Sequence, residues 1–191
     1  MALARASHCR HGVLKAVCWE CTRENMGLSG HSGHREVLAG VAESLRPASY
    51  LEVGVRDGGS LRAVLAVHHP ARLTLCDDWG RQYGGTGRGS HDHVEALLAE
   101  LGFAGEVAWL DGCSYDLLPE LPSSAYDVVH VDGDHSVYGA LYDLMEARRL
   151  RTRCGAIAAH DLSFSTVARA VRLFGRPDIE FTGDTGTGLW L

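Results

Sequence analysis

The sequence lacks long hydrophobic runs and has no excess of basic residues. No apolar segment among its 191 residues approaches the length that is needed to span a membrane. The first residues, MALARASHCRHGV, contain no continuous apolar signal core. The net charge is −6, whereas proteins that bind nucleic acids usually present a basic face. We therefore expect a protein that binds neither a membrane nor nucleic acid.

Cysteines are few and unevenly placed, which argues against a disulfide framework. Three of the six lie close together near the start of the chain, and the other three occur singly in apolar surroundings. This distribution predicts a reducing, cytoplasmic compartment. The length suits one domain, or one domain with a small appendage.

The clustered cysteines have the spacing of a metal site. Cys9-x-His11 is followed, after six residues, by Cys18-x-x-Cys21. Two close pairs of such ligands suit tetrahedral zinc, and His8 could take the place of His11. We predict that this segment binds one zinc ion with a structural role. The alternative is a frayed terminus with free thiols.

Helical and strand-like patterns alternate through residues 31–191, which we predict to form one domain after the zinc-binding appendage of residues 1–30. The predicted helices span residues 34–45, 60–68, 92–102, 138–150 and 164–175. The predicted strands span residues 49–55, 72–77, 106–112, 126–132 and 155–161, followed by a hairpin of residues 179–184 and 188–191. Strands that alternate with helices indicate an α/β, doubly wound, mostly parallel sheet that is covered on both faces.

Polar residues and glycines stand where the first three predicted strands end, and ligands of such sheets bind beyond the carboxyl ends of the strands. The first strand runs into EVGVRDGGS, in which Gly54 and Gly58 permit a tight turn. Free amides of the following helix, near Ser60, could hold a carboxylate or a phosphate. The second strand ends at Asp77 and Asp78, where a carboxylate can accept the hydroxyls of a ribose. The third ends in DGCSYD, which could border an adenine.

The fourth and fifth predicted strands end in carboxylates and imidazoles. DVVHVDGDHS begins as a buried strand and then places Asp132, Asp134 and His135 within four positions. The fifth strand ends in His160 and Asp161. Oxygen ligands favour Mg²⁺ or Ca²⁺, and an added imidazole also admits Mn²⁺ or another transition metal. Neighbouring strand ends could therefore hold one divalent cation.

Five segments, in this order, resemble the motifs of class I S-adenosylmethionine-dependent methyltransferases: YLEVGVRDGGS, LTLCDDW, WLDGCSYD, YDVVHVDGDHSVYGALYDL and GAIAAHDL. Within that class the chain is most similar to small-molecule O-methyltransferases with a DGDHSY-type segment and a late HD. The resemblance covers residues 32–191. It implies a seven-stranded, Rossmann-like sheet and relatives that often form homodimers. The sequence departs from the pattern where Val137 precedes Tyr138, and where Arg56 and Asp57 replace smaller residues.

The resemblance also implies a cofactor, an acceptor and the residues that contact them. The implied cofactor is S-adenosylmethionine, bound by Glu52, Gly54 and Gly58 on its methionine side, by Asp77 on its ribose, and by Ser114 and Tyr115 beside its adenine. The implied acceptor is a small molecule with a hydroxyl near a second oxygen, as in a catechol or a sugar diol.

Metal-dependent members that the chain resembles hold a divalent cation at the sulfonium end of the cofactor. We expect Asp132 and Asp161 to bind Mg²⁺ or Mn²⁺, with His160 as a third ligand or as an orienting residue. His135 is the candidate general base, because its ordinary pKa suits proton removal near neutral pH.

Other interpretations stay open. Asp134 and His135 could serve only the start of the following helix, with Asp134 or Ser136 as its N-cap. The glycine-rich loop of residues 79–93 could be a lid or an ordinary surface loop. An NAD-dependent oxidoreductase would share the glycine turn and the acid, although the spacing is G-x-x-x-G rather than G-x-G-x-x-G. A third class is a non-enzymatic, zinc-anchored adaptor on a methyltransferase fold.

Overall fold

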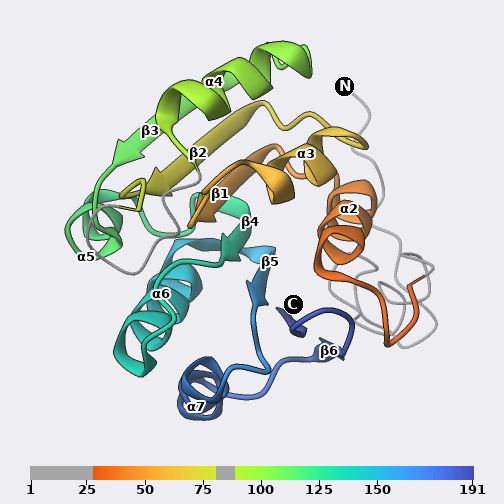
Figure 1. Ribbon diagram of the computed structural model, residues 1–191, viewed down its shortest axis with the longest axis vertical. Helices are drawn as coiled ribbons and strands as arrows, with labels where there is room; N and C mark the ends of the chain where they lie inside the picture. Colours follow the sequence, from red (N-terminus) through yellow and green to blue (C-terminus); the bar gives the residue numbers. More distant parts are fainter. Residues whose placement is uncertain (1–27, 81–88) are drawn as a thin grey trace.

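A seven-stranded sheet forms the centre of the structure, as Figure 1 shows. The computed structural model describes residues 28–80 and 89–191. The strands are β1 (Ser49–Val53), β2 (Arg72–Asp77), β3 (Glu106–Asp111), β4 (Tyr126–Val131), β5 (Arg151–His160), β6 (Ile179–Phe181) and β7 (Thr187–Trp190). Their order in the sheet is β3-β2-β1-β4-β5-β7-β6. Neighbouring strands among β1 to β5 are parallel, whereas β7 runs antiparallel to both β5 and β6.

Helices cover both faces of the sheet (Figure 1). One face packs against α2 (His34–Leu45), α3 (Gly59–Leu65) and α4 (His91–Glu100), and the other against α6 (Val137–Leu150) and α7 (Ser165–Phe174). The short α5 (Ser114–Leu117) and η2 (Leu118–Glu120) follow β3. On β4, Val128 belongs to the core under α2 and its neighbour Val129 to the core under α6. This alternation is typical of a strand that is buried on both faces.

The predicted architecture is confirmed, and the bounds of several elements differ. α3 ends at Leu65 rather than at residue 68, and β6 ends at Phe181 rather than at residue 184. β1 ends at Val53 rather than at residue 55, because Gly54 turns the chain with a φ of +87°. β5 begins at Arg151 rather than at residue 155, because Tyr126 of β4 pairs with Arg151 before the register shifts. The sequence pattern does not predict α5 and η2, since 4 and 3 residues are too few to show a helical period.

Two predicted features lie outside the described residues. One is the zinc site of Cys9, His11, Cys18 and Cys21, so the division of the chain at residue 30 stays a prediction. The other is the middle of the glycine-rich loop, residues 81–88. In the parts of the chain that the structure does describe, no helix has the length and apolar character that crossing a membrane requires.

Candidate active site

A large pocket opens at the carboxyl ends of the parallel strands. Its volume is about 1270 Å³, which exceeds the roughly 300–1,000 Å³ that is usual for small-molecule sites. Residues at the ends of β1, β2, β4 and β5 and after β3 line it, together with the start of α2 and the loop between β6 and β7. A pocket of this size can hold two small molecules at once.

Gly54 brings the ends of β1 and β4 together. Its amide donates to the carbonyl oxygen of Cys76 at 2.9 Å, and the Asp132 amide donates to the carbonyl oxygen of Val53 at 2.8 Å. A Cβ atom at Gly54 would meet the carbonyl oxygen of Asp132 at 2.1 Å. Its φ of +87° also favours glycine. Gly58, the N-cap of α3, has a φ of +74°. Both glycines therefore serve the tight turn that the sequence predicts.

Asp77 ties this turn to the end of β2. Its Oδ2 accepts from the amides of Val55 and Arg56, both at 2.7 Å. Its Oδ1 accepts from the amide of Trp79 at 2.5 Å. A carboxylate has about four acceptor positions, so three are used within the chain and about one remains for a ligand. Asp78 lines the pocket beside it.

Glu52 lies beneath the pocket and is not among its lining residues. The side chain is fully buried on β1. Its Oε2 accepts from the hydroxyl of Tyr50 at 3.0 Å, and its Oε1 accepts from the hydroxyl of Ser60. Burial, with Glu52 adding to the effect, raises the pKa of Tyr50. Glu52 thus fixes the position of Ser60, which does line the pocket.

The segment after β3 forms another part of the pocket wall. Cys113, Ser114 and Tyr115 line the pocket. The Tyr115 ring lies at 17° to that of Tyr138, with the ring centres 5.9 Å apart, and 4.5 Å from the ring of Tyr142. Burial raises the pKa of Tyr115 to about 12, so the phenol stays protonated near neutral pH. Of these three rings only Tyr115 lines the pocket, where it could lie beside a planar base.

Asp132, His135 and Asp161 converge on one point of the pocket. Nε2 of His135 lies 3.5 Å from Oδ1 of Asp132 and 3.2 Å from Oδ2 of Asp161. One ligand atom from each of the three residues lies within 4.8 Å of the others. Asp132 and Asp161 raise the pKa of His135, because both favour the imidazolium. Burial acts to raise the pKa of Asp132, but His135 and His160 outweigh it and hold this pKa below its usual range.

His160 contacts the same cluster through both ring nitrogens. Its Nδ1 lies 3.3 Å from Oδ2 of Asp132, and its Nε2 lies 3.0 Å from the hydroxyl of Thr185. The Thr185 hydroxyl also donates to Oδ1 of Asp161. Of the two roles that the sequence leaves open for His160, this geometry favours the orienting one. Thr185, in the β6–β7 loop, has no motif that would identify it from the sequence.

Two buried histidines near the cluster were not among the predicted site residues. His34, at the start of α2, stacks on His160 with the ring centres 3.8 Å apart at 24°. The ring of His130 on β4 lies 4.8 Å from that of His34. Burial lowers the pKa of His34 to about 2, and His130 and His160 add to the effect. The signal for His130 was available, since an imidazole interrupts the valine run of DVVHVD.

The structure shows which of two candidate residues, Asp134 or Ser136, is the N-cap of α6. Ser136 is the N-cap, and its hydroxyl oxygen accepts from the amide of Gly139 at 2.9 Å. Asp134 accepts from the amide and the hydroxyl of Ser136 at 2.8 and 3.0 Å. Asp134 therefore supports the cap, while His135 between them points to Asp132 and Asp161.

Comparison with known families identifies the domain. A family model described as a methyltransferase domain matches residues 51–162, which is more than half of the chain. The chain belongs to this methyltransferase family. A comparison with curated proteins found no match. The NAD-dependent oxidoreductase that the sequence left open is therefore set aside.

Solved structures share this fold, and two of the three described here are O-methyltransferases. The O-methyltransferase TomG from Streptomyces achromogenes, in complex with SAM, is 21% identical with a TM-score of 0.62, covering 92% of this chain and 86% of its own. Cofactor-bound Rv0187 from MTB is 19% identical with a TM-score of 0.63, covering 89% and 85%. The O-methyltransferase NovP is 18% identical with a TM-score of 0.63, covering 82% and 78%.

The match to the methyltransferase family runs from β1 to the residues just after β5. It therefore includes the glycine turn, Asp77 and the cluster of Asp132, His135 and Asp161. His34 and Thr185 lie outside the matched residues and reach the same pocket from α2 and from the β6–β7 loop.

Proposed function

We propose that this methyltransferase uses S-adenosylmethionine to methylate a hydroxyl group of a small molecule. One observation carries the proposal. A single pocket joins the glycine turn, Asp77 and Asp78 on one side to the cluster of Asp132, His135 and Asp161 on the other. In support, the similar structures of TomG and NovP are O-methyltransferases, and TomG was solved with SAM.

The cofactor would occupy the side of the pocket formed by β1, β2 and β3. The close backbone approach at Gly54 leaves room for the methionine part, beside Gly59 and Ser60. The ribose would lie against Asp77, whose remaining acceptor position suits one hydroxyl, and against Asp78. The adenine would lie along Ser114 and Tyr115. The acceptor would then occupy the remaining side, near β4 and β5.

The acceptor side fits a divalent cation. Asp132 and Asp161 supply carboxylate oxygens within 4.8 Å of each other, and Mg²⁺ and Mn²⁺ prefer such ligands. We propose that these two residues bind the cation and that His160 orients Asp132. When bound, such a cation stabilises the alkoxide form of the acceptor.

His135 is the proposed general base. The acceptor oxygen bonds to the methyl carbon as the carbon–sulfur bond breaks, and the hydroxyl proton passes to Nε2 of His135. The products are a methyl ether and S-adenosylhomocysteine. Phe164, whose ring centre lies 5.5 Å from that of His135, borders this position in the pocket. An apolar wall beside the base suits an acceptor with a ring, of the catechol or sugar-diol type.

Calorimetry with S-adenosylhomocysteine tests the cofactor side. We expect wild-type protein to bind it and Asp77→Ala to bind about thirtyfold or more weakly. The variant loses one charge-assisted hydrogen bond to the ribose and the three amide contacts that hold the turn, which together should cost roughly 2–3 kcal/mol of binding. Asp116→Ala, at an exposed acid of α5, is the matched control. Equal affinity of the wild type and Asp77→Ala would remove Asp77 from the site.

Methyl transfer to a panel of catechols and sugar diols tests the acceptor side. We expect EDTA to abolish turnover and Mg²⁺ or Mn²⁺ to restore it. Asp161→Asn should lose both rate and metal dependence while it still binds S-adenosylhomocysteine. Full activity in EDTA would contradict the metal role and leave His135 as a base that acts without an ion.

A further inference from the structure

Buried imidazoles beside the proposed catalytic cluster have no part in the proposed reaction. His34 is 6% exposed and His130 is 0% exposed. Nε2 of His34 and both ring nitrogens of His130 lack a hydrogen-bond partner within the described structure. Leaving a buried polar atom without a partner costs about 1–3 kcal/mol, and such atoms in native proteins often mark an ion or a water that belongs there.

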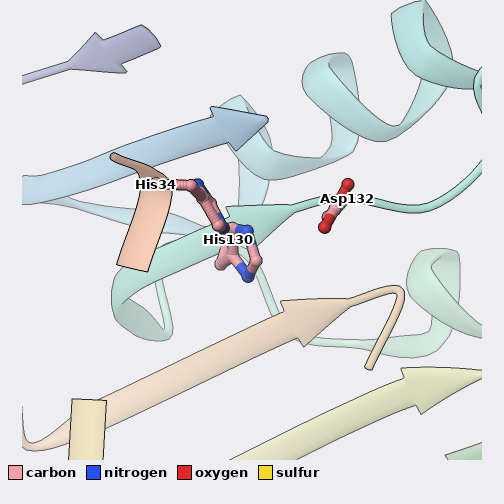
Figure 2. A group of neighbouring side chains, drawn as sticks. All are labelled: His34, His130 and Asp132. Carbon is pink, nitrogen blue, oxygen red and sulfur yellow. The ribbon is translucent and has the colours of Figure 1, made fainter. Parts of the chain in front are cut away.

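We propose that His34, His130 and Asp132 bind a transition-metal ion. Figure 2 shows His34 reaching from α2 to lie next to His130, with Asp132 beyond the end of the strand that carries His130. One ligand atom from each residue lies within 4.8 Å of the other two. A tetrahedral ion with bonds of about 2.0–2.1 Å holds its ligand atoms about 3.4 Å apart. Small inward movements of the three side chains would therefore complete the site.

The strand pattern explains why these groups meet. Side chains alternate along a strand, so His130 and Asp132 point to the same face of the sheet. Glu52 of β1 pairs with His130 of β4 and shares that face. α2 covers the same face and brings His34 to it. The site is thus formed by residues that are distant in the chain.

An oxygen of another side chain lies near Nδ1 of each imidazole, at hydrogen-bond distance in His34 only. Nδ1 of His34 lies 3.1 Å from the hydroxyl of Thr187. Nδ1 of His130 lies 3.6 Å from Oε1 of Glu52, an ion-pair distance that is slightly long for a hydrogen bond. Histidines that bind metals commonly direct the second nitrogen to a hydroxyl, carbonyl or carboxylate, which fixes the ring and its tautomer. In both residues this leaves Nε2 for the ion.

The ligand set selects the kind of ion and separates this site from the catalytic one. Two imidazoles and one carboxylate suit Zn²⁺, Co²⁺, Mn²⁺ or Fe²⁺ rather than Mg²⁺. Oδ2 of Asp132 contacts His160, which stacks on His34, whereas Oδ1 faces His135. We therefore assign Oδ2 to the new site and leave Oδ1 to the catalytic cation. The inference does not depend on methyl transfer.

Co²⁺ added to the full-length protein is the probe. Exchangeable N–H protons of imidazoles that bind Co²⁺ give strongly shifted proton NMR signals, and we expect one each from His34 and His130. His34→Phe and His130→Phe keep a ring in place but supply no nitrogen, so each should remove its own signal and weaken Co²⁺ binding at least tenfold. A signal from residues 1–30 would persist in both variants.

Two controls locate the ion. His93→Phe, at an exposed position of α4, should change nothing. Asp161→Asn should leave both shifted signals in place, because it belongs only to the catalytic cation site. Signals that disappear in Asp161→Asn but persist in His34→Phe would overturn the proposal, as would an unchanged Co²⁺ affinity in folded His34→Phe. If His130→Phe does not fold, His34→Phe alone decides. Calorimetry with S-adenosylhomocysteine on the same variants shows whether cofactor binding is independent of this metal site.

Discussion

Gly54 lines the pocket and has no room for a side chain. In Gly54→Ala, the new Cβ would meet the carbonyl oxygen of Asp132 at 2.1 Å, at a φ of +87°. Strain and overpacking together should lower the free energy of unfolding by about 2–4 kcal/mol. The end of β4 would also move, so binding of S-adenosylhomocysteine should weaken. Urea denaturation and calorimetry measure the two effects.

Gly102→Ala is the matched control for this prediction. Gly102 also has a positive φ, +66°, but nothing lies within 4 Å of where its Cβ would be. The control should therefore lose only the backbone contribution, about 1 kcal/mol. Equal losses of unfolding free energy in the two variants would show that the contact with Asp132 adds nothing to the cost of a side chain at Gly54.

Asp143 should make the stability of the protein depend on pH. This carboxyl of α6 is buried, and burial raises its pKa to about 7, against the opposing effect of the nearby Ser114 hydroxyl. The folded protein therefore favours the protonated form, while the unfolded chain ionises near pH 4. The free energy of unfolding should fall as the pH rises from about 4 to about 7, by up to about 4 kcal/mol. Above pH 7 the loss is complete.

The substitution Asp143→Asn isolates this effect. An amide cannot ionise, so the variant should lack the fall between pH 4 and 7 and should be more stable than the wild type at pH 8. Asp116→Asn, at an exposed position, should follow the wild-type profile. Urea denaturation at a series of pH values gives the profiles, and parallel curves for wild type and Asp143→Asn would contradict the assignment.

The sequence predicts which residues reach the pocket better than what they do there. Asp77 is at the predicted position, but three of its acceptor positions hold backbone amides of the turn. Glu52 lies beneath the pocket and acts through Ser60. These differences depend on distances between strand ends, and a one-dimensional pattern contains no such distances.

Among the elements, α6 contributes most directly to the catalytic side of the pocket, because its N-terminal cap lies next to His135. Ser136→Ala removes the hydroxyl that accepts from the Gly139 amide. The free energy of unfolding should fall by about 1 kcal/mol. Asp134 also loses a partner in this variant, so methyl transfer should slow. Thermal or urea denaturation and steady-state rates measure the two effects.

Ser90→Ala gives the matched comparison, because Ser90 is the N-cap of α4 and accepts from the His93 amide. It should cost a similar free energy without slowing methyl transfer, since no residue of α4 is among those that line the pocket. Equal slowing in both variants would mean that the rate follows general stability rather than the position of His135.

Elements with a long, regular pattern could be predicted, and irregular ones could not. α2 and β2 have the predicted bounds, because Pro47 ends the helical pattern soon after Leu45 and the strand is a short apolar run. The early start of β5 could not be predicted, because Arg151 to Cys154 lack the apolar character of a strand. It arises from pairing with Tyr126, a contact between distant segments.

At the scale of the whole molecule, the zinc segment and the methyltransferase domain should be separable. We expect about one equivalent of zinc in protein purified without added metal, and Cys18→Ser should lose it. Binding of S-adenosylhomocysteine should survive, because the described residues that line the pocket all belong to the domain predicted to begin at residue 31. Elemental analysis and calorimetry test the two parts, and an unchanged zinc content in Cys18→Ser would reject this ligand set. Cys154→Ser, at an exposed cysteine, is the control.

The sheet order could be anticipated from the class of fold, but the joining of α2 to the active site could not. His34 and His160 are 126 positions apart in the chain. They meet because α2 packs on the face of the sheet to which Ala156 and Ala158 of β5 point. The sequence shows both histidines. Only the tertiary structure shows that they stack.

The position of β7 has a consequence for how the protein is made. β7 lies between β5 and β6 although ribosomes synthesise it after both. A nascent chain that ends before β7 therefore cannot add β6 to the sheet, and β5 keeps an unpaired edge that invites pairing with other chains. Thr185, which contacts His160 and Asp161, lies two residues before this strand begins. The pocket should thus be completed only after β7 has been synthesised, and chains that stall before it should be prone to aggregate.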